Sequence, residues 1–171
     1  MPPACPVRYR VARNDDEPFL WTALYHAIHV PAGEAAPPPE IVRRPESARY
    51  VRGWSPRAEP GVIAEAADDG RPVGAAWVRL LSGAGAGHGH VADDVPELAI
   101  AVLPGWRGRG VGTAMLQRLL RAVEPRYPGV SLSVSRTNPA RRLYERHGFR
   151  EVGSKDTSLI MRRDTRAGPA E

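Results

Sequence analysis

The sequence LAIAVLP at residues 98–104, followed by RGRGVG at residues 107–112, decides the expected fold of this chain. The first stretch alternates larger apolar residues with alanine, a pattern typical of a strand that packs one face into a core. Pro104 ends this strand, and the apolar spacing from Thr113 onward predicts a helix. A strand, a glycine-rich turn and a helix N-terminus in this order predict a phosphate site, because the N–H groups of the turn and the helix dipole attract anions.

Hydrophobic periodicity and turn residues predict further elements on both sides of this unit. Before it, we expect a strand at 7–12, a helix capped at 14–16, a loop at 31–40, a short helix at 45–54, hairpin strands at 62–67 and 73–81, and a glycine-rich mobile loop at 82–96. After it, we expect a helix from 111 to 123, a strand at 130–134, a helix from 138 to 147, and strands from 149 and at 159–161. The sequence therefore predicts one α/β domain over residues 1–171, with flexible tails at 1–6 and 165–171.

The composition argues against a nucleic-acid partner. The chain carries 24 basic and 19 acidic residues and a net charge of +5, but its basic residues are scattered arginines with Lys155 as the single lysine. Nucleic-acid binders more often show a basic stripe with interleaved aromatic residues. A nucleic-acid-binding domain stays as an alternative, and it would bind DNA or RNA with a strong dependence on salt.

The sequence also gives no sign of a membrane, disulfide or metal role. No apolar run approaches the roughly 18 to 20 residues that span a bilayer, and residues 1–5 lack the pattern of a secretory signal, so we expect a cytoplasmic protein without a membrane partner. Cys5 is the single cysteine and cannot form an internal disulfide. His88 and His90 lie in a glycine-rich loop without acidic residues at ligand spacing, so we expect no metal site.

Two well-known nucleotide motifs compete for the glycine-rich turn, and neither fits it. A Walker-type loop requires four residues between two glycines and then a lysine, which this turn lacks. Gly108, Gly110 and Gly112 do not have the spacing of a dinucleotide fingerprint, and the N-terminal half lacks the longer series of strands and helices that usually accompanies it. The turn alone therefore leaves the phosphate ligand open.

Two motifs resemble those of the GNAT superfamily of N-acetyltransferases. Segment 96–120 resembles the acetyl-CoA motif Arg/Gln-x-x-Gly-x-Gly/Ala, with Arg107, Gly110 and Gly112 at its fixed positions. Segment 131–153 resembles the second motif, and the matching residues are Asn138, Ala140, Leu143, Tyr144, Gly148 and Phe149. The resemblance implies an α/β (α+β) fold with a mixed sheet of about six or seven strands, about four flanking helices, and two parallel strands splayed at the coenzyme site.

The same resemblance implies acetyl-CoA as donor and the primary amine of a small molecule or peptide as acceptor, and it leaves a homodimer open. By this implication the end of the central strand pairs with the pantetheine arm, and the N–H groups of 109–113 hold the diphosphate. Asn138 caps the next helix and also contacts the coenzyme. The implied cofactor-binding residues are Ile100, Val102, Leu103, Pro104, Arg107, Gly108, Arg109, Gly110, Val111, Gly112, Thr113, Asn138 and Arg141.

The resemblance also implies which residues carry out the proton transfers of such a reaction. Glu97 is the expected base that takes a proton from the amine, directly or through a water, with Asp93 and Asp94 as rivals. Tyr144 is the expected acid that protonates the departing thiolate. The alternative function is an acyl-CoA-binding sensor or regulatory module without catalysis.

Several aromatic residues in the first half of the chain are candidates for the acceptor pocket. Packing in the core is the alternative for each of them. The candidates are Trp21, Tyr25, Tyr50, Trp54 and Trp77. No pattern in the loops at 31–54 and 82–96 identifies the acceptor.

Overall fold

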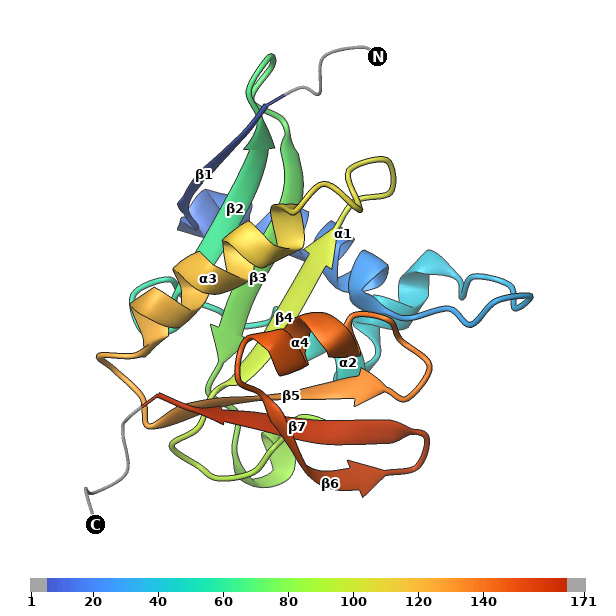
Figure 1. Cartoon of the computed structure of the whole chain (residues 1–171), viewed down its shortest axis with the longest axis vertical. Coiled ribbons are helices and arrows are strands. Elements are labelled where there is room, and N and C mark those ends of the chain that lie inside the picture. The colour runs from blue at the N-terminus through green and yellow to red at the C-terminus, as the bar shows by residue number, and fades with distance from the viewer. Residues whose placement is uncertain (1–5, 166–171) are drawn as a thin grey trace.

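A seven-stranded mixed sheet forms the centre of the molecule (Figure 1). The structure, a computed structural model, describes residues 6–165. The strands lie in the order β1-β2-β3-β4-β5-β7-β6. Their bounds are β1 Val7–Val11, β2 Gly61–Ala66, β3 Pro72–Arg79, β4 Glu97–Val102, β5 Gly129–Ser135, β6 Arg150–Lys155 and β7 Ser158–Asp164. The predicted tails, and Cys5 with them, lie outside the described residues apart from Pro6 and Thr165.

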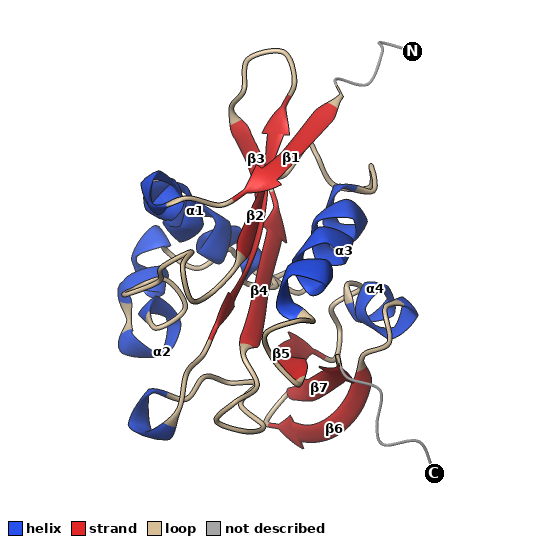
Figure 2. Ribbon diagram, turned by 90° about the vertical axis from the view of Figure 1, so that its left-hand side faces the viewer, coloured by secondary structure: helices blue, strands red, loops and turns tan. Residues whose placement is uncertain are grey.

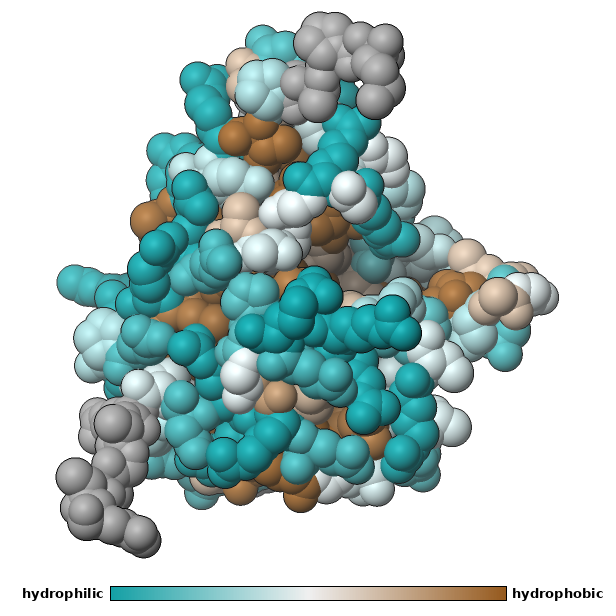
Figure 3. Space-filling view, in the orientation of Figure 1, coloured by the Kyte–Doolittle hydropathy of each residue, from teal (hydrophilic) through white to brown (hydrophobic). Residues whose placement is uncertain are grey.

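Helices cover both faces of this sheet. The α-helices are α1 Glu17–Ala27, α2 Pro45–Ala48, α3 Val111–Val123 and α4 Arg141–Arg146, and three short 3-10 helices are η1 Asn14–Asp16, η2 Pro39–Arg43 and η3 Gly83–Gly85. Figure 2 shows α1 and α2 on one face and α3 and α4 on the other. The outer surface on the side of α3 and α4 is mostly hydrophilic, with small apolar areas between polar side chains (Figure 3). None of the helices in the described residues is long and apolar enough to cross a membrane.

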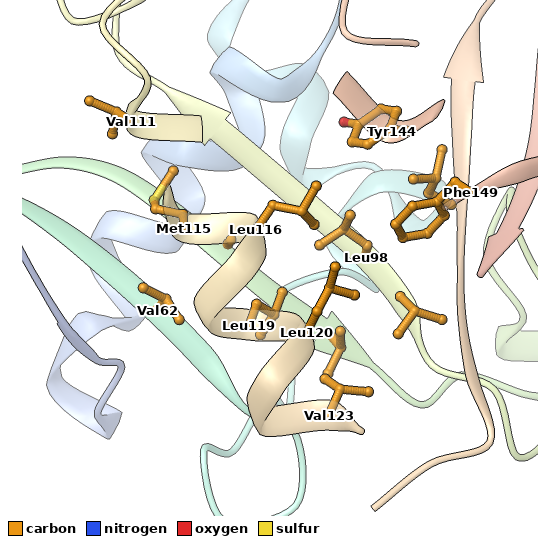
Figure 4. Packing of buried hydrophobic residues seen from close by; sticks show 14 of the residues in the cluster. Val62, Leu98, Val111, Met115, Leu116, Leu119, Leu120, Val123, Tyr144 and Phe149 are labelled. Carbon is orange, nitrogen blue, oxygen red and sulfur yellow. The ribbon is translucent and has the colours of Figure 1, made fainter. Parts of the chain in front are cut away.

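Each face of the sheet has its own hydrophobic core. Residues of β4 alternate between the two cores: Leu98 belongs to the core under α3, and Ala101 belongs to the core under α1. The apolar stripe predicted for α3 is confirmed, and it packs on the sheet as Figure 4 shows. The buried side chains of α3 are Val111, Met115, Leu116, Leu119, Leu120 and Val123. Because a fully buried side chain of this size contributes about 1.5–3 kcal/mol, this stripe fixes α3, and with it the preceding turn, against the sheet.

The parallel strands β4 and β5 separate soon after they meet. β3 pairs with β4 over the whole length from Arg79 to Gly74, whereas β4 and β5 share one register pair, between Glu97 and Ser131. Figure 1 shows the two strands diverging from that point. The structure therefore confirms the expected mixed sheet, its seven strands and four α-helices, and the splayed parallel pair.

Three predicted helix boundaries differ from the structure. The helix expected at 45–54 ends at Ala48, and turn hydrogen bonds continue the chain to Trp54, whose N–H donates to Val51. The helix expected to start at 138 starts at Arg141, because Asn138 closes a separate turn in which its Oδ1 accepts the N–H of Ala140 at 2.9 Å. At the N-terminus, residues 14–16 form η1 before α1 begins, since the Asp16 carboxylate accepts the Arg13 N–H at 2.7 Å.

Candidate active site

The turn between β4 and α3 is open to a ligand. Gly105, Gly108 and Gly110 all have positive φ, of 88°, 74° and 77°, and no described atom lies within 4 Å of the position a Cβ would take at any of them. Gly110 is the N-cap of α3. The N–H groups of the first helical turn after it have no intrahelical partner, so they can donate to an anion. The predicted cradle is therefore present as a backbone shape.

Arg107 braces this turn against two other elements. Its Nε donates to the Val102 carbonyl at the end of β4 at 2.9 Å, and its Nη2 donates to the His26 carbonyl in α1 at 3.3 Å. Arg109 lies over the Trp106 ring, 5.0 Å from its centroid, and Arg141 pairs with Glu145 at 2.8 Å. All three arginines among the predicted cofactor-binding residues are thus held by contacts within the protein.

One edge of β4 faces β3, and the other edge faces the separation from β5. Leu103 donates its N–H to Val73 on the β3 side, at 2.8 Å. Because successive residues of a strand direct their backbone groups to opposite edges, Ile100 and Val102 face the separation. The predicted role in binding the donor therefore fits the backbone of Ile100 and the N–H of Val102 better than Leu103, whose N–H is already used. The Val102 carbonyl already accepts the bond from Arg107.

Tyr144 lies in α4 beside the core under α3. Its side chain is buried, its ring packs edge-on against Phe149 with centroids 5.9 Å apart, and its hydroxyl points away from that ring (Figure 4). None of the hydrogen bonds among residues 6–165 involves the Tyr144 hydroxyl. Burial raises the pKa of Tyr144 to about 12, because the phenolate would be poorly solvated there. The side chain is therefore a neutral, unpaired O–H donor at neutral pH.

Glu97, the expected base at the start of β4, is enclosed by other parts of the chain. It is 1% exposed and accepts three hydrogen bonds, from the Tyr50 hydroxyl at 3.0 Å, the Gly87 N–H at 2.9 Å and the Gly89 N–H at 2.8 Å. Ser131, its register partner on β5, is fully buried, and its hydroxyl is the one buried side-chain polar atom without a hydrogen-bond partner in the described part of the chain.

Sequence reasoning missed the groups that enclose Glu97. The loop at 82–96 was expected to be mobile, and Tyr50 was considered only as an acceptor contact or a core residue. Both meet Glu97 through contacts between segments distant in sequence, and no local motif signals such contacts. The glycines at 87 and 89 are the one sequence feature that agrees with this close enclosure, because a Cβ at either position would collide with neighbouring atoms.

The aromatic acceptor candidates divide into two groups. Trp21 and Tyr25 line an open hollow of about 390 Å³ between α1 and η2, where the Arg43 guanidinium lies 3.8 Å from the Trp21 ring centroid. Trp54 and Trp77 are buried in the core under α1, and their indole N–H groups donate to the carbonyls of Glu59 and Tyr50. Trp54 and Trp77 therefore belong to the core and do not line the hollow.

The predicted loop histidines also lie apart from any ligand cluster. His90 contacts Asp93 at 3.1 Å, and His88 stacks on Tyr50. Within residues 6–165 there is no group of three or more His, Cys, Asp or Glu side chains that could hold a metal ion.

A family model described as "Acetyltransferase (GNAT) domain" matches residues 59–151, which run from just before β2 into β6. The chain belongs to the GNAT acetyltransferase family. A comparison with curated protein sequences finds no match.

Solved structures share the fold over nearly the whole chain. The chain is 21% identical to SsHAT, with 94% of this chain and 99% of that chain covered and a TM-score of 0.70. It is 19% identical to yncA from Salmonella typhimurium, solved with its cofactor acetyl-CoA, with 97% and 98% covered and a TM-score of 0.62. It is 20% identical to the ribosomal-protein-S18-alanine N-acetyltransferase from Escherichia coli, with 96% and 97% covered and a TM-score of 0.59. At these identities the likeness shows the fold alone.

Proposed function

We propose that the chain transfers an acetyl group from acetyl-CoA to the primary amine of a small molecule or peptide, by direct attack of the amine in a ternary complex. One observation carries this proposal: in a chain of the GNAT family, an open glycine turn stands at the end of β4, where that strand has separated from β5. An extended donor with a diphosphate fits such a site, because the strand edge offers amide partners and the turn offers N–H donors.

The donor would be held mainly by backbone groups. The backbone of Ile100 and the N–H of Val102 would pair with the amides of the pantetheine arm, and the N–H groups of 109–113 would hold the diphosphate. Arg107 would keep the turn in shape through its bonds to β4 and α1. Asn138 would stabilise the turn before α4 and face the coenzyme from that side.

Two proton transfers complete the reaction. The amine nitrogen bonds to the acetyl carbonyl carbon, the carbon–sulfur bond breaks, and the sulfur leaves as a thiolate. Tyr144 would give its proton to that thiolate, and its raised pKa keeps it protonated until then. Glu97 would accept the proton of the amine through a water, since its burial prevents direct contact. The unpaired Ser131 hydroxyl on the neighbouring strand is suited to bind such a water.

The enclosure of Glu97 favours one second candidate, an acyl-CoA-binding module that does not catalyse transfer. In that case the three hydrogen bonds to Glu97 would serve only to hold the loop. The two candidates differ in turnover and agree in donor binding.

Release of free thiol from acetyl-CoA, measured against a panel of amines and short peptides, separates these candidates. The proposal expects thiol release that depends on the amine and saturates with its concentration. Mass spectrometry should then show a product about 42 mass units heavier than the amine, because an acetyl group replaces a hydrogen. Donor binding without release for every amine would support the non-catalytic module and overturn the transferase.

A further inference from the structure

We infer that Tyr50 is a positioning residue for the reaction proposed above, on which this inference rests: its hydroxyl holds the Glu97 carboxylate and the loop at 83–90 in one fixed arrangement. The Tyr50 hydroxyl donates to Glu97 Oε1 at 3.0 Å and accepts the His88 N–H at 2.9 Å. The same loop donates to Glu97 through the N–H groups of Gly87 and Gly89. Tyr50 is therefore the side chain that joins the carboxylate to the loop.

The loop fits over Glu97 without room to spare. A Cβ at Gly87 would lie 2.5 Å from the Tyr50 hydroxyl oxygen and as close to both oxygens of Glu97. A Cβ at Gly89 would lie 2.6 Å from the backbone carbon of Leu132 on β5. The loop thus lies across β4 and β5 near the point where they separate, and it forms a wall on the side of the sheet covered by α1 and α2.

Tyr50 is itself held in place by the protein interior. Its carbonyl accepts the indole N–H of Trp77 at 2.7 Å, and Trp77 is fully buried. Arg79 donates to the carbonyls of Arg49 and Arg52, on either side of Tyr50, at 2.6 and 2.8 Å. Buried donors and acceptors that are all paired fix a single geometry, because breaking any one of them leaves a polar group unsatisfied.

The electrostatics of the hydroxyl suit this role. Burial and the neighbouring Glu97 carboxylate raise the pKa of Tyr50, so that it stays a neutral O–H donor. Hydrogen bonds from such donors stabilise the carboxylate charge and select one of its rotamers. Loss of the hydroxyl would leave one oxygen of Glu97 and one amide of the loop short of a partner, while the glycine turn that receives the donor stays unchanged.

Tyr50→Phe tests this role, with Tyr127→Phe as the matched control. The Tyr127 hydroxyl donates to the Ala58 carbonyl at 2.7 Å, and it makes no hydrogen bond to Glu97 or to the loop at 83–90 in the described part of the chain. We expect Tyr50→Phe to lower kcat by about tenfold or more with the KM for acetyl-CoA unchanged, and to speed amide exchange at Gly87 and Gly89. Tyr127→Phe should change none of these quantities.

A pair of loop variants tests the same arrangement without touching Tyr50. Gly87→Ala forces a methyl group between Glu97 and Tyr50, whereas Gly85→Ala, two residues earlier, meets no described atom within 4 Å and needs no positive φ. We expect Gly87→Ala to reproduce the loss of kcat and Gly85→Ala to match the wild type.

The outcomes separate this inference from the proposed function. An active wild type with a Tyr50→Phe variant of equal kcat overturns the role of Tyr50 and leaves the acetyltransferase standing. A loss of activity that comes entirely from a higher KM for acetyl-CoA also overturns it, because that result places Tyr50 in donor binding. A wild type that releases no thiol with any amine overturns the proposed function and this role together.

Discussion

Gly110→Ala is the substitution whose effect can be worked out most fully from the structure. Gly110 has φ 77° and ψ 8° as the N-cap of α3, and no described atom lies within 4 Å of the added Cβ. The cost is therefore conformational: an alanine in this left-handed region costs about 1–2 kcal/mol. Lower entropy of the unfolded chain offsets roughly 0.4–1 kcal/mol of that. We expect a net loss of about 1 kcal/mol, which lowers Tm by about 2–4 °C in a chain of this size.

The same methyl group enters the open space where we propose that the diphosphate binds. Loss of one hydrogen bond to a charged group costs about 1.5–3 kcal/mol, which corresponds to roughly 10- to 150-fold weaker binding. Gly70→Ala is the matched control, because Gly70 has φ 74° and an equally open Cβ position but belongs to the β2–β3 hairpin. It should lose the same stability and keep its affinity for acetyl-CoA.

Thermal unfolding without ligand and titration calorimetry with acetyl-CoA measure these two effects separately. Equal affinity of Gly110→Ala and Gly70→Ala for acetyl-CoA would refute the assignment of the turn to the donor phosphates. Equal stability of Gly110→Ala and the wild type would refute the conformational argument itself.

Three further predictions concern Tyr144 and the buried Arg79–Glu59 pair. Tyr144→Phe should lower kcat by roughly 100-fold with little change in affinity for acetyl-CoA, and an unaltered kcat in steady-state assays removes Tyr144 from the mechanism. The pKa of Tyr144 is about 12 in the folded chain and roughly 10 in an unfolded one, so its contribution to stability is present below pH 10 and is lost as the pH rises through 12. If the free energies of unfolding of the wild type and Tyr144→Phe differ by the same amount at every pH from about 9 to 12, this prediction is wrong. Arg79→Met leaves the Glu59 carboxylate buried without its 2.9 Å ion pair and should destabilise the chain by about 3–5 kcal/mol in urea unfolding, whereas a loss under 1 kcal/mol, roughly the value of an exposed pair, would show that the pair is solvated.

The parts of the fold that local chemistry determines could be predicted from the sequence. The stripe of α3 follows from helical spacing, and the turn before it follows from glycines that tolerate positive φ. The β2–β3 hairpin follows from alternation around Gly70 in the same way. The splay of β4 from β5 was expected only through the family motifs, since no residue pattern by itself indicates where two parallel strands part.

The surroundings of Glu97 could not be predicted, because they depend on contacts between distant segments. Tyr50 and Glu97 are 47 residues apart, and Arg79 meets Glu59 across 20. Trp77 resembled an aromatic acceptor contact in the sequence, and in the structure its indole holds the Tyr50 carbonyl. Such tertiary contacts decide whether an acidic or aromatic residue is accessible, and sequence periodicity carries no information on them.

The shift in Tm produced by acetyl-CoA tests the central claim, donor binding at the glycine turn, most directly. If the dissociation constant is near 10 μM, then 1 mM acetyl-CoA stabilises the folded chain by about 2.7 kcal/mol and raises Tm by roughly 5–10 °C. The account predicts this rise for the wild type and a clearly smaller one for Gly110→Ala. An unchanged Tm of the wild type at millimolar acetyl-CoA would contradict the account.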